Sequence, residues 1–184
     1  MREYFNFNKT LQATALLLKK AGGALSRIAL LKLLYLSDRQ FLLEYGCTIT
    51  GDVMYAMKYG PVLDITYNLL KGKDSQSVLW RKYIQTQTES KEKTAFLILD
   101  RGTGDLSKAE LDTIEDVFNQ YGAQPRFDLV EFTHSFPEWK RYYKEDTSTR
   151  ISPDEILRIN NREDLIETLK ENIAIAREQH YLFG

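Results

Sequence analysis

Three side chains of this sequence have the chemistry of acid–base catalysis. Asp38, Asp52 and His134 provide two carboxylates and an imidazole, the groups with which hydrolases activate water. Cys47 adds a thiol that His134 and an aspartate would have to activate from distant positions in the chain. A small hydrolase that uses Asp38, Asp52 and His134 is therefore one hypothesis, and it requires these side chains to meet in one cleft.

The common catalytic motifs are missing from the sequence. The patterns G-x-S-x-G, H-E-x-x-H and C-x-x-C do not occur, and GTGD at residues 102–105 lacks the third glycine of a dinucleotide-binding loop. Gly46 and Gly51 have the spacing of phosphate-binding glycines, but Asp52 and Val53 stand where Lys and Ser or Thr are needed. We therefore expect a protein that is not an enzyme and needs no cofactor.

Metal and nucleic-acid binding have little support in the residue pattern. Cys47, His134 and His180 are far apart in the sequence and form no local pair of metal ligands. The formal net charge is -1 and the pI is about 6.2, so no overall positive field attracts nucleic acid. The cluster at residues 140–143 mixes cations with aromatic rings, which keeps a nucleic-acid-binding regulator as a third hypothesis.

Asp38 places a carboxylate on an otherwise apolar helix face. The residues three and four positions away are largely apolar, namely Leu34, Tyr35, Phe41 and Leu42. An unpaired buried carboxylate costs several kcal/mol, so Asp38 should have a partner, for which Lys58, Arg39 or the N–H groups of a loop qualify. We interpret Asp38 as a structural tie between helix and loop, with a ligand or partner contact as the alternative.

For two further motifs, a structural role is the preferred interpretation. Thr50, Gly51 and Asp52 belong to a segment that predicts a turn closed by bonds from side chains to the backbone. His134 and Trp139 flank a second turn, where we expect a hydrogen-bonded histidine and a tryptophan in the core or at its rim.

The hydrophobic pattern predicts the elements that position these residues, beginning with two helices. The first covers residues 8–20, with Asn8 as its cap and Gly22 as its stop. Ser26 caps the second, which is apolar on nearly every face and ends at Gly46. This second helix belongs in the centre of the fold.

Residues with high strand propensity predict three strands. Residues 53–59 form the first, which Gly60 and Pro61 end, and Pro61 opens a helix that continues to residue 72. Residues 78–87 and 94–100 form the other two strands, joined by a hairpin loop at 88–93. We expect all three in one small antiparallel sheet and no strand beyond residue 122.

The C-terminal half is predicted to be helical. Its segments are a helix from the capping box Ser107–Glu110 to Gly122, short helices at 127–132 and 138–143, a helix opened by a second capping box at Ser152–Glu155, and a last helix from Asp164. The predicted fold class is α+β, mainly α-helical, with a central buried helix, surrounding helices and a small antiparallel β-sheet of about three strands.

The composition indicates one domain over residues 1–184, with its core motif at 32–62. Hydrophobic residues make up 43% of the chain, which is enough for a packed core without disulfides. Cys47 is the single cysteine, the first residues lack the apolar run of a signal peptide, and no stretch reaches the ~20 apolar residues of a membrane span. We expect a cytoplasmic protein without membrane contact.

A recognisable pattern begins in the core motif and continues beyond it. It consists of KLLYL at 32–36 followed by Asp38, ITGD at 49–52, Ala56, and YGPV at 59–62, with weaker matches at Leu106, Ser107, Glu110, Thr133, His134, Trp139 and Ile151. The pattern resembles the Panacea domain, the SocA-like family that is also catalogued as phage-associated proteins. The motif or partner-contact candidates are Asp38, Thr50, Gly51, Asp52, Tyr55, Lys58, Tyr59, Gly60, Pro61, His134 and Trp139.

The resemblance implies an antitoxin-type module that neutralises a cognate toxin protein by direct contact and has no enzymatic activity. The toxin is usually encoded by the adjacent gene, and one family role is delivery of the bound toxin to a protease. Relatives often carry an added DNA-binding segment, whereas few residues precede the first predicted helix here, so autoregulation is not expected. Because the family accepts varied partners, we expect the motif to hold the scaffold and the neighbouring surface to bind the toxin.

Overall fold

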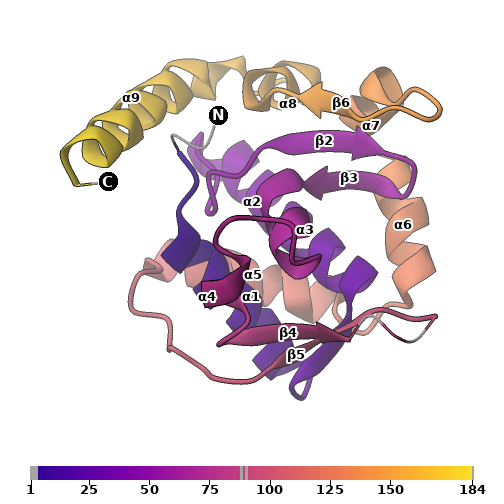
Figure 1. The fold of residues 1–184 in the computed structure, drawn as a ribbon. Helices are drawn as coiled ribbons and strands as arrows, with labels where there is room; N and C mark the ends of the chain where they lie inside the picture. Colours follow the sequence, from indigo (N-terminus) through magenta and orange to yellow (C-terminus); the bar gives the residue numbers. More distant parts are fainter. Residues whose placement is uncertain (1–3, 88, 90, 184) are drawn as a thin grey trace.

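Helix α2 (Arg27–Tyr45) crosses the middle of the molecule in the computed structural model, which describes residues 4–87, 89 and 91–183 (Figure 1). The side chain of Ser26 accepts a hydrogen bond from the Ala29 N–H at 3.2 Å, and Gly46 ends the helix with φ +69°. Every residue from Ala29 to Asp38 is buried, because apolar side chains occupy nearly all faces of the helix. The prediction of a central buried helix is confirmed.

Two small antiparallel sheets lie on opposite sides of α2 (Figure 1). The first has the strand order β1-β5-β4, with β1 at Ala24–Ser26, β5 at Thr94–Leu97 and β4 at Ile84–Gln87. The second has the order β3-β2-β6, with β3 at Gly60–Leu63, β2 at Met54–Met57 and β6 at Thr149–Ile151. The mainly helical α+β fold class is confirmed, with its strands divided between two sheets.

The predicted grouping of the strands is wrong. The β4–β5 hairpin forms, although Thr88 and Ser90 of its loop lie outside the described residues, but β2 does not join it. Strand β1 extends the hairpin instead, and the Leu97 N–H donates to the Gly23 carbonyl at 2.9 Å. The segment predicted as a strand from residue 78 begins with a short helix, α4 (Ser77–Trp80).

Strand β3 takes the place of the predicted first turn of a helix. Gly60 and Pro61 begin this strand, and α3 (Asp64–Leu70) starts only after it. Proline has no N–H for a sheet ladder, and it is tolerated here because β3 is an edge strand. Lys58 and Tyr59 form the tight turn between β2 and β3, and Gly60 follows this turn with φ +89°.

The C-terminal half is largely helical, as predicted. Its helices are α5 (Lys108–Tyr121), α6 (Arg126–His134), α7 (Pro137–Tyr142), α8 (Pro153–Ile159) and α9 (Ile166–Phe183), the last after a 3-10 turn at Glu163–Leu165. The capping box of Ser107 and Glu110 is present with both of its hydrogen bonds. The second box does not form, because the Ser152 hydroxyl donates to Asp154, and β6 overturns the expectation that no strand lies beyond residue 122.

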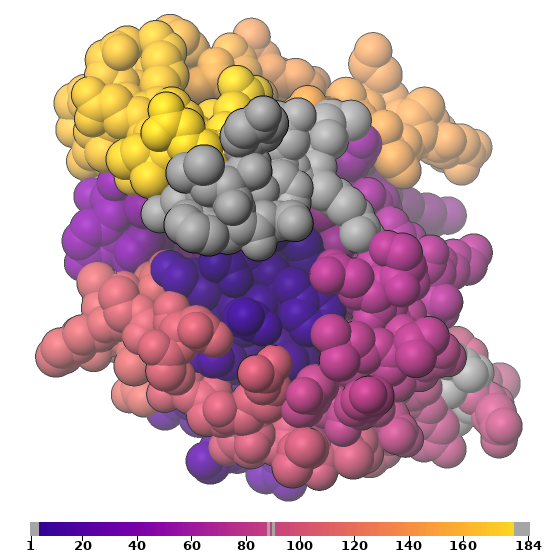
Figure 2. All heavy atoms as spheres, turned by 60° about the vertical axis from the view of Figure 1, so that its left-hand side comes forward, coloured from indigo at the N-terminus to yellow at the C-terminus, as the bar shows by residue number. Residues whose placement is uncertain are grey.

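Helix α1 (Phe7–Lys20) packs on α2 and is capped by Asn6 instead of Asn8. The Asn6 side chain accepts a hydrogen bond from the Lys9 N–H at 3.0 Å, whereas Asn8 lies inside the helix. Helix α9 (yellow) lies at the edge of the molecule, on the face where α1 (indigo) reaches the surface (Figure 2). None of the helices in the described part of the chain has the length and apolar content to cross a membrane.

Candidate partner-binding site

The motif residues form two groups at opposite ends of the β2–β3 hairpin. The first group, which we call the buried tie, lies where the hairpin begins and consists of Asp38, Thr50, Gly51 and Asp52. The second group, which we call the hairpin end, surrounds the turn and consists of Lys58, Tyr59, Gly60 and Pro61. Strand β2, whose four residues span roughly 13 Å, lies between the two groups.

Asp38 joins α2 to the loop before β2. Its Oδ1 accepts hydrogen bonds from the N–H groups of Ile49 and Thr50 at 2.9 and 3.0 Å, and its Oδ2 accepts one from the Thr50 hydroxyl. Burial raises the pKa of Asp38 to about 7, against the opposing effect of these hydrogen bonds. The loop N–H groups are thus the partners of Asp38, and neither Lys58 nor Arg39 is.

Arg39 instead binds Glu138 of α7. Its Nε donates to Glu138 Oε1 at 2.5 Å, and the Tyr35 hydroxyl donates to the same oxygen at 3.1 Å. Glu138 is fully buried, so the guanidinium supplies the charge that this carboxylate needs. Arg39 also donates to Asn160 at 2.9 Å, which links α2 with the end of α8.

Asp52 caps helix α3 from a distance in sequence. Leu63, at the cap position of α3, gives the helix no side-chain hydrogen bond. Asp52 Oδ1 accepts from the Ile65 N–H at 2.9 Å, and Oδ2 accepts from the Thr66 N–H at 2.8 Å, which satisfies two N–H groups of the first turn. Burial raises the pKa of Asp52 to about 6, while the bonds to Thr66, Ile65 and Val53 lower it.

Gly51 and Tyr55 have structural positions beside this tie. Gly51 has φ +64°, and a Cβ at this residue would overlap the carbonyl of Tyr4. The predicted closure of the turn is present, because Thr48 Oγ1 accepts from the Gly51 N–H at 3.2 Å and Thr50 Oγ1 accepts from the Asp52 N–H at 3.1 Å. Tyr55 is half-buried in β2 and faces Val62 across the ladder.

His134 and Trp139 contact the β2–β3 hairpin at Lys58 and Met57. Their rings stack with centroids 3.9 Å apart, and Trp139 Nε1 donates to the Met57 carbonyl at 2.9 Å. His134 has a backbone hydrogen bond with Lys58, but its Nε2 is buried without a partner in the described part of the chain. The expected hydrogen bonding of this histidine is therefore incomplete, and burial lowers its pKa.

Asp38, Asp52 and His134 do not meet in one cleft, as a hydrolase that used them would require. Asp38 and Asp52 belong to the buried tie and have their oxygens occupied by hydrogen bonds, whereas His134 contacts the hairpin end. The charged groups that act on Cys47 are Glu110, Lys9 and Asp38, and His134 is not among them. In the described ranges, no three His, Cys, Asp or Glu side chains lie close enough together to hold a metal ion.

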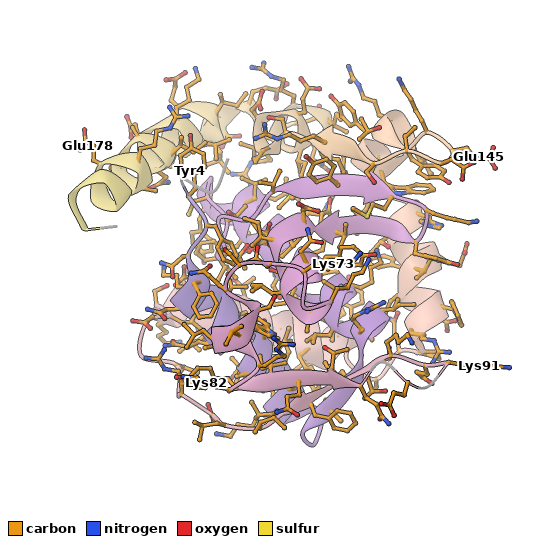
Figure 3. All side chains as sticks on the ribbon, in the orientation of Figure 1. Tyr4, Lys73, Lys82, Lys91, Glu145 and Glu178 are labelled. Atoms are coloured by element: carbon orange, nitrogen blue, oxygen red, sulfur yellow. The ribbon has the colours of Figure 1, made fainter. Side chains whose placement is uncertain are left out.

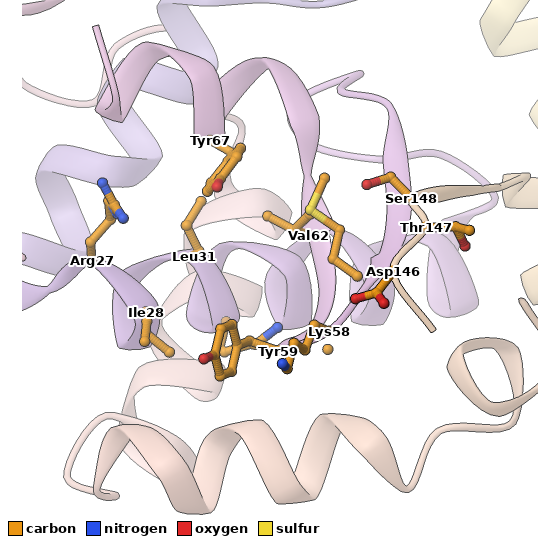
Figure 4. Close-up of a pocket in the computed structure, with 13 residues that line it drawn as sticks. Arg27, Ile28, Leu31, Lys58, Tyr59, Val62, Tyr67, Asp146, Thr147 and Ser148 are labelled. Atoms are coloured by element: carbon orange, nitrogen blue, oxygen red, sulfur yellow. The ribbon is translucent and has the colours of Figure 1, made fainter. Parts of the chain in front are cut away.

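A pocket of about 400 Å³ opens beside the hairpin end (Figure 4). One wall is the first turns of α2, with Arg27, Ile28 and Leu31. The hairpin end forms another wall, Tyr67 of α3 closes a third side, and residues 146–148 face α2 across the opening. The pocket is thus built by segments that are far apart in the sequence, and the motif supplies a large part of its lining.

Lys32 is the buried cation of this pocket. Its residue exposure is 3%, and its Nζ donates to the Pro61 carbonyl at 2.7 Å. Burial lowers the pKa of Lys32 to about 7. Gly60 makes room for the ammonium group, because a Cβ at this position would lie 2.7 Å from Nζ.

A second hollow, of about 290 Å³, continues the surface beyond Tyr59. It shares Arg27, Ile28 and Tyr59 with the first pocket and adds Phe127 among its lining residues. The side chains of Tyr59 and Phe127 are 57% and 54% exposed, which is high for rings of this size. The two hollows together form one surface with exposed aromatic and cationic groups, which we call the pocket face.

The sequence pattern did not identify Lys32 or Arg27 as site residues. Lys32 stands in a run of leucines, and a lysine inside a helix that is apolar on all faces is the signal that could have marked it. Residues 146–148 carry no such signal, because only the pairing of β6 with β2 brings them to the pocket.

The fold and the site define a mainly helical α+β domain with a cationic pocket beside the β2–β3 hairpin. The model of one family, described as antitoxin SocA-like, Panacea domain, matches residues 30–140, which is more than half of the chain. The chain belongs to this family. Neither the curated proteins nor the solved structures contain a significant match.

Proposed function

We propose that this protein is an antitoxin that neutralises a cognate toxin by direct protein–protein contact and without catalysis. The observation that carries this proposal is its membership of the SocA-like antitoxin family over residues 30–140. The match includes the whole core motif, from Lys32 through the hairpin end, together with His134 and Trp139.

The pocket face is the surface we assign to the toxin. Exposed tyrosine and phenylalanine rings next to arginine are typical of the centre of a protein interface, and Tyr59, Phe127 and Arg27 supply them here. The buried tie, by contrast, has its polar groups satisfied internally and serves the scaffold. This division agrees with a family in which a shared motif holds the fold and a variable surface selects the partner.

We extend the proposal to the finer features of the role on the basis of the same family membership. The toxin would be the product of the adjacent gene, and both proteins would meet in the cytoplasm. Binding would either block the toxin directly or present it to a protease, with the antitoxin as the adaptor.

Co-expression tests the proposed function. The product of the adjacent gene should arrest growth when it is expressed alone, and this chain should restore growth. A neighbour that is harmless alone, or growth arrest that persists in the presence of this chain, would contradict the proposal.

Substitution of exposed apolar residues tests the assigned surface. Tyr59→Ala should abolish the rescue of growth, because it removes the most exposed ring of the pocket face. Leu99→Ala is the matched control, since Leu99 is exposed to a similar extent, 55%, and does not line either hollow. Equal rescue by both variants would place the interface elsewhere.

A further inference from the structure

The ammonium group of Lys32 has more donors than acceptors. A lysine side chain offers three N–H donors, and the hydrogen bond to the Pro61 carbonyl uses one of them. No described carboxylate lies within ion-pair distance of Lys32, although the residue is only 3% exposed. A buried cation with a single neutral partner is costly, so the free protein keeps Lys32 in an unfavourable state.

The same pocket carries two more cations. Arg27 and Lys58 line it, and neither forms an ion pair within the described ranges. The acidic side chain among the lining residues is Asp146, on the far side from α2 (Figure 4). The excess of positive charge favours an anionic occupant.

The pocket also has apolar walls. Ile28, Leu31 and Val62 line it together with Met57, next to the cationic groups. An occupant that covers these walls must be apolar beside its negative charge. A nucleic-acid backbone is polar along its whole length and would leave the walls in contact with water.

We propose that this pocket receives an acidic side chain of the toxin, an aspartate or glutamate whose carboxylate pairs with Lys32 and whose apolar neighbours cover Ile28, Leu31 and Met57. The inference rests on the proposed function, because it names the chemistry by which the same surface recognises its partner. Gly60 has a defined part in it: a Cβ at this position would lie 2.7 Å from both Lys32 Nζ and Thr133 Oγ1, so the missing side chain leaves room for the ammonium group beside the pocket.

Calorimetric binding of the purified adjacent-gene product tests the pairing. Lys32→Met keeps an unbranched side chain that is one atom shorter and removes the charge, and it should weaken binding at least tenfold. Lys82→Met is the matched control, because Lys82 is an exposed lysine next to β4, outside both hollows, and should bind like the wild type (Figure 3). Unchanged affinity of a folded Lys32→Met protein would overturn the inference.

A measurement on the unmodified chain tests the pairing of Lys32 with a toxin carboxylate even if Lys32→Met fails to fold. The ¹³Cε resonance of Lys32 is titrated with pH in the free protein and in the complex with the toxin. A carboxylate next to the ammonium group should raise the pKa of Lys32 by at least one unit in the complex. An unshifted titration in the complex would overturn the inference.

The outcomes separate this inference from the proposed function. Failure of the wild-type chain to bind the toxin contradicts the proposed function itself. Binding that is insensitive to Lys32 contradicts only the carboxylate pairing. A single-stranded oligonucleotide that shifts the Lys32 resonance and competes with the toxin would assign the pocket to phosphate and overturn the inference as well.

Discussion

Two buried charges on α2, Asp38 and Lys32, have opposite environments. Every donor that Asp38 needs comes from the loop at residues 49–50, so its carboxylate is satisfied within the fold. Lys32 has one backbone acceptor and faces a pocket. One motif therefore combines a carboxylate that is satisfied within the fold with an ammonium group that has one acceptor and lines a pocket.

Asp38 is expected to contribute to the stability of the fold and not to partner binding. Asp38→Ala leaves the donors of Ile49 and Thr50 unpaired in the interior, and it should lower the free energy of unfolding by about 2–4 kcal/mol. Asp38→Asn keeps an acceptor for the two N–H groups and should cost about half as much. Urea unfolding measures both variants. An unchanged midpoint for Asp38→Ala, together with lost toxin binding, would show that Asp38 is a contact residue and not a tie.

Lys32 is expected to make the stability of the fold depend on pH. Burial lowers the pKa of Lys32 from 10.5 to about 7, so the folded chain binds fewer protons than the unfolded chain between these values. Lys32 should therefore make the free energy of unfolding rise with pH in this window, by roughly 2 kcal/mol between pH 7 and 9. Lys32→Met should lack this rise. Urea unfolding of both proteins at pH 7 and 9 checks the difference, and parallel pH profiles would contradict it.

The interpretation of Asp38 as a tie could be reached from the sequence, but the role of Lys32 could not. A carboxylate among leucines needs nearby donors, and the turn at residues 48–52 offered them within the same motif. The environment of Lys32 depends on Gly60 and Pro61, which the pattern assigned to a strand end and a helix start. Because strand β3 was not predicted, the Pro61 carbonyl could not be recognised as the acceptor for Lys32.

At the scale of elements, the β2–β3 hairpin connects the scaffold to the pocket. Its first end is fixed by Asp52, which also caps α3, and its turn carries Lys58 and Tyr59 into the pocket face. Trp139 of α7 holds the last residue of β2, through the hydrogen bond to the Met57 carbonyl. Strand β2 is therefore held near both of its ends, which restricts the motion of the turn that carries the exposed Tyr59.

Gly60 is expected to be the residue of the hairpin end that tolerates a side chain least. Gly60→Ala meets two costs: a positive φ of +89° and a Cβ that would lie 2.7 Å from Lys32 Nζ and Thr133 Oγ1. Gly102→Ala meets only the first, because φ is +76° and no atom lies within 4 Å of the added Cβ. Gly102→Ala should cost about 1 kcal/mol and Gly60→Ala about 1–3 kcal/mol more, measured by urea unfolding. Equal costs would mean that Lys32 and Thr133 move aside freely.

The elements that could be predicted are those whose signal is local. Helix α2 has an apolar pattern, a serine cap and a terminal glycine, and α5 has a complete capping box, so both follow from the sequence. Strands β1 and β6 have three residues each and exist only through their pairing with β5 and β2. Such short strands show no periodicity, and their partners are distant in the chain.

At the scale of the whole molecule, α2 carries a sheet on each side and a polar link to the C-terminal helices. Arg39 joins α2 to Glu138 and Asn160, and the latter lies beyond the end of the region that matches the family at residue 140. Helix α8 is further tied to the core by Ile156 and Leu157, which are fully buried. These contacts predict that the part of the chain after residue 140 unfolds together with the family region, as one domain.

The two tryptophans allow this last prediction to be tested, because they report on different halves of the molecule. Trp80 is buried against Phe7, near the first sheet, and Trp139 lies against His134 beside the second. Trp80→Phe and Trp139→Phe each leave one fluorescent probe, and in each variant the urea transition seen by fluorescence should coincide with that seen by far-ultraviolet circular dichroism. The comparison is made within each variant, since each substitution shifts the midpoint by its own cost. A fluorescence transition that precedes the loss of helix in either variant would show that the two sides of α2 unfold separately.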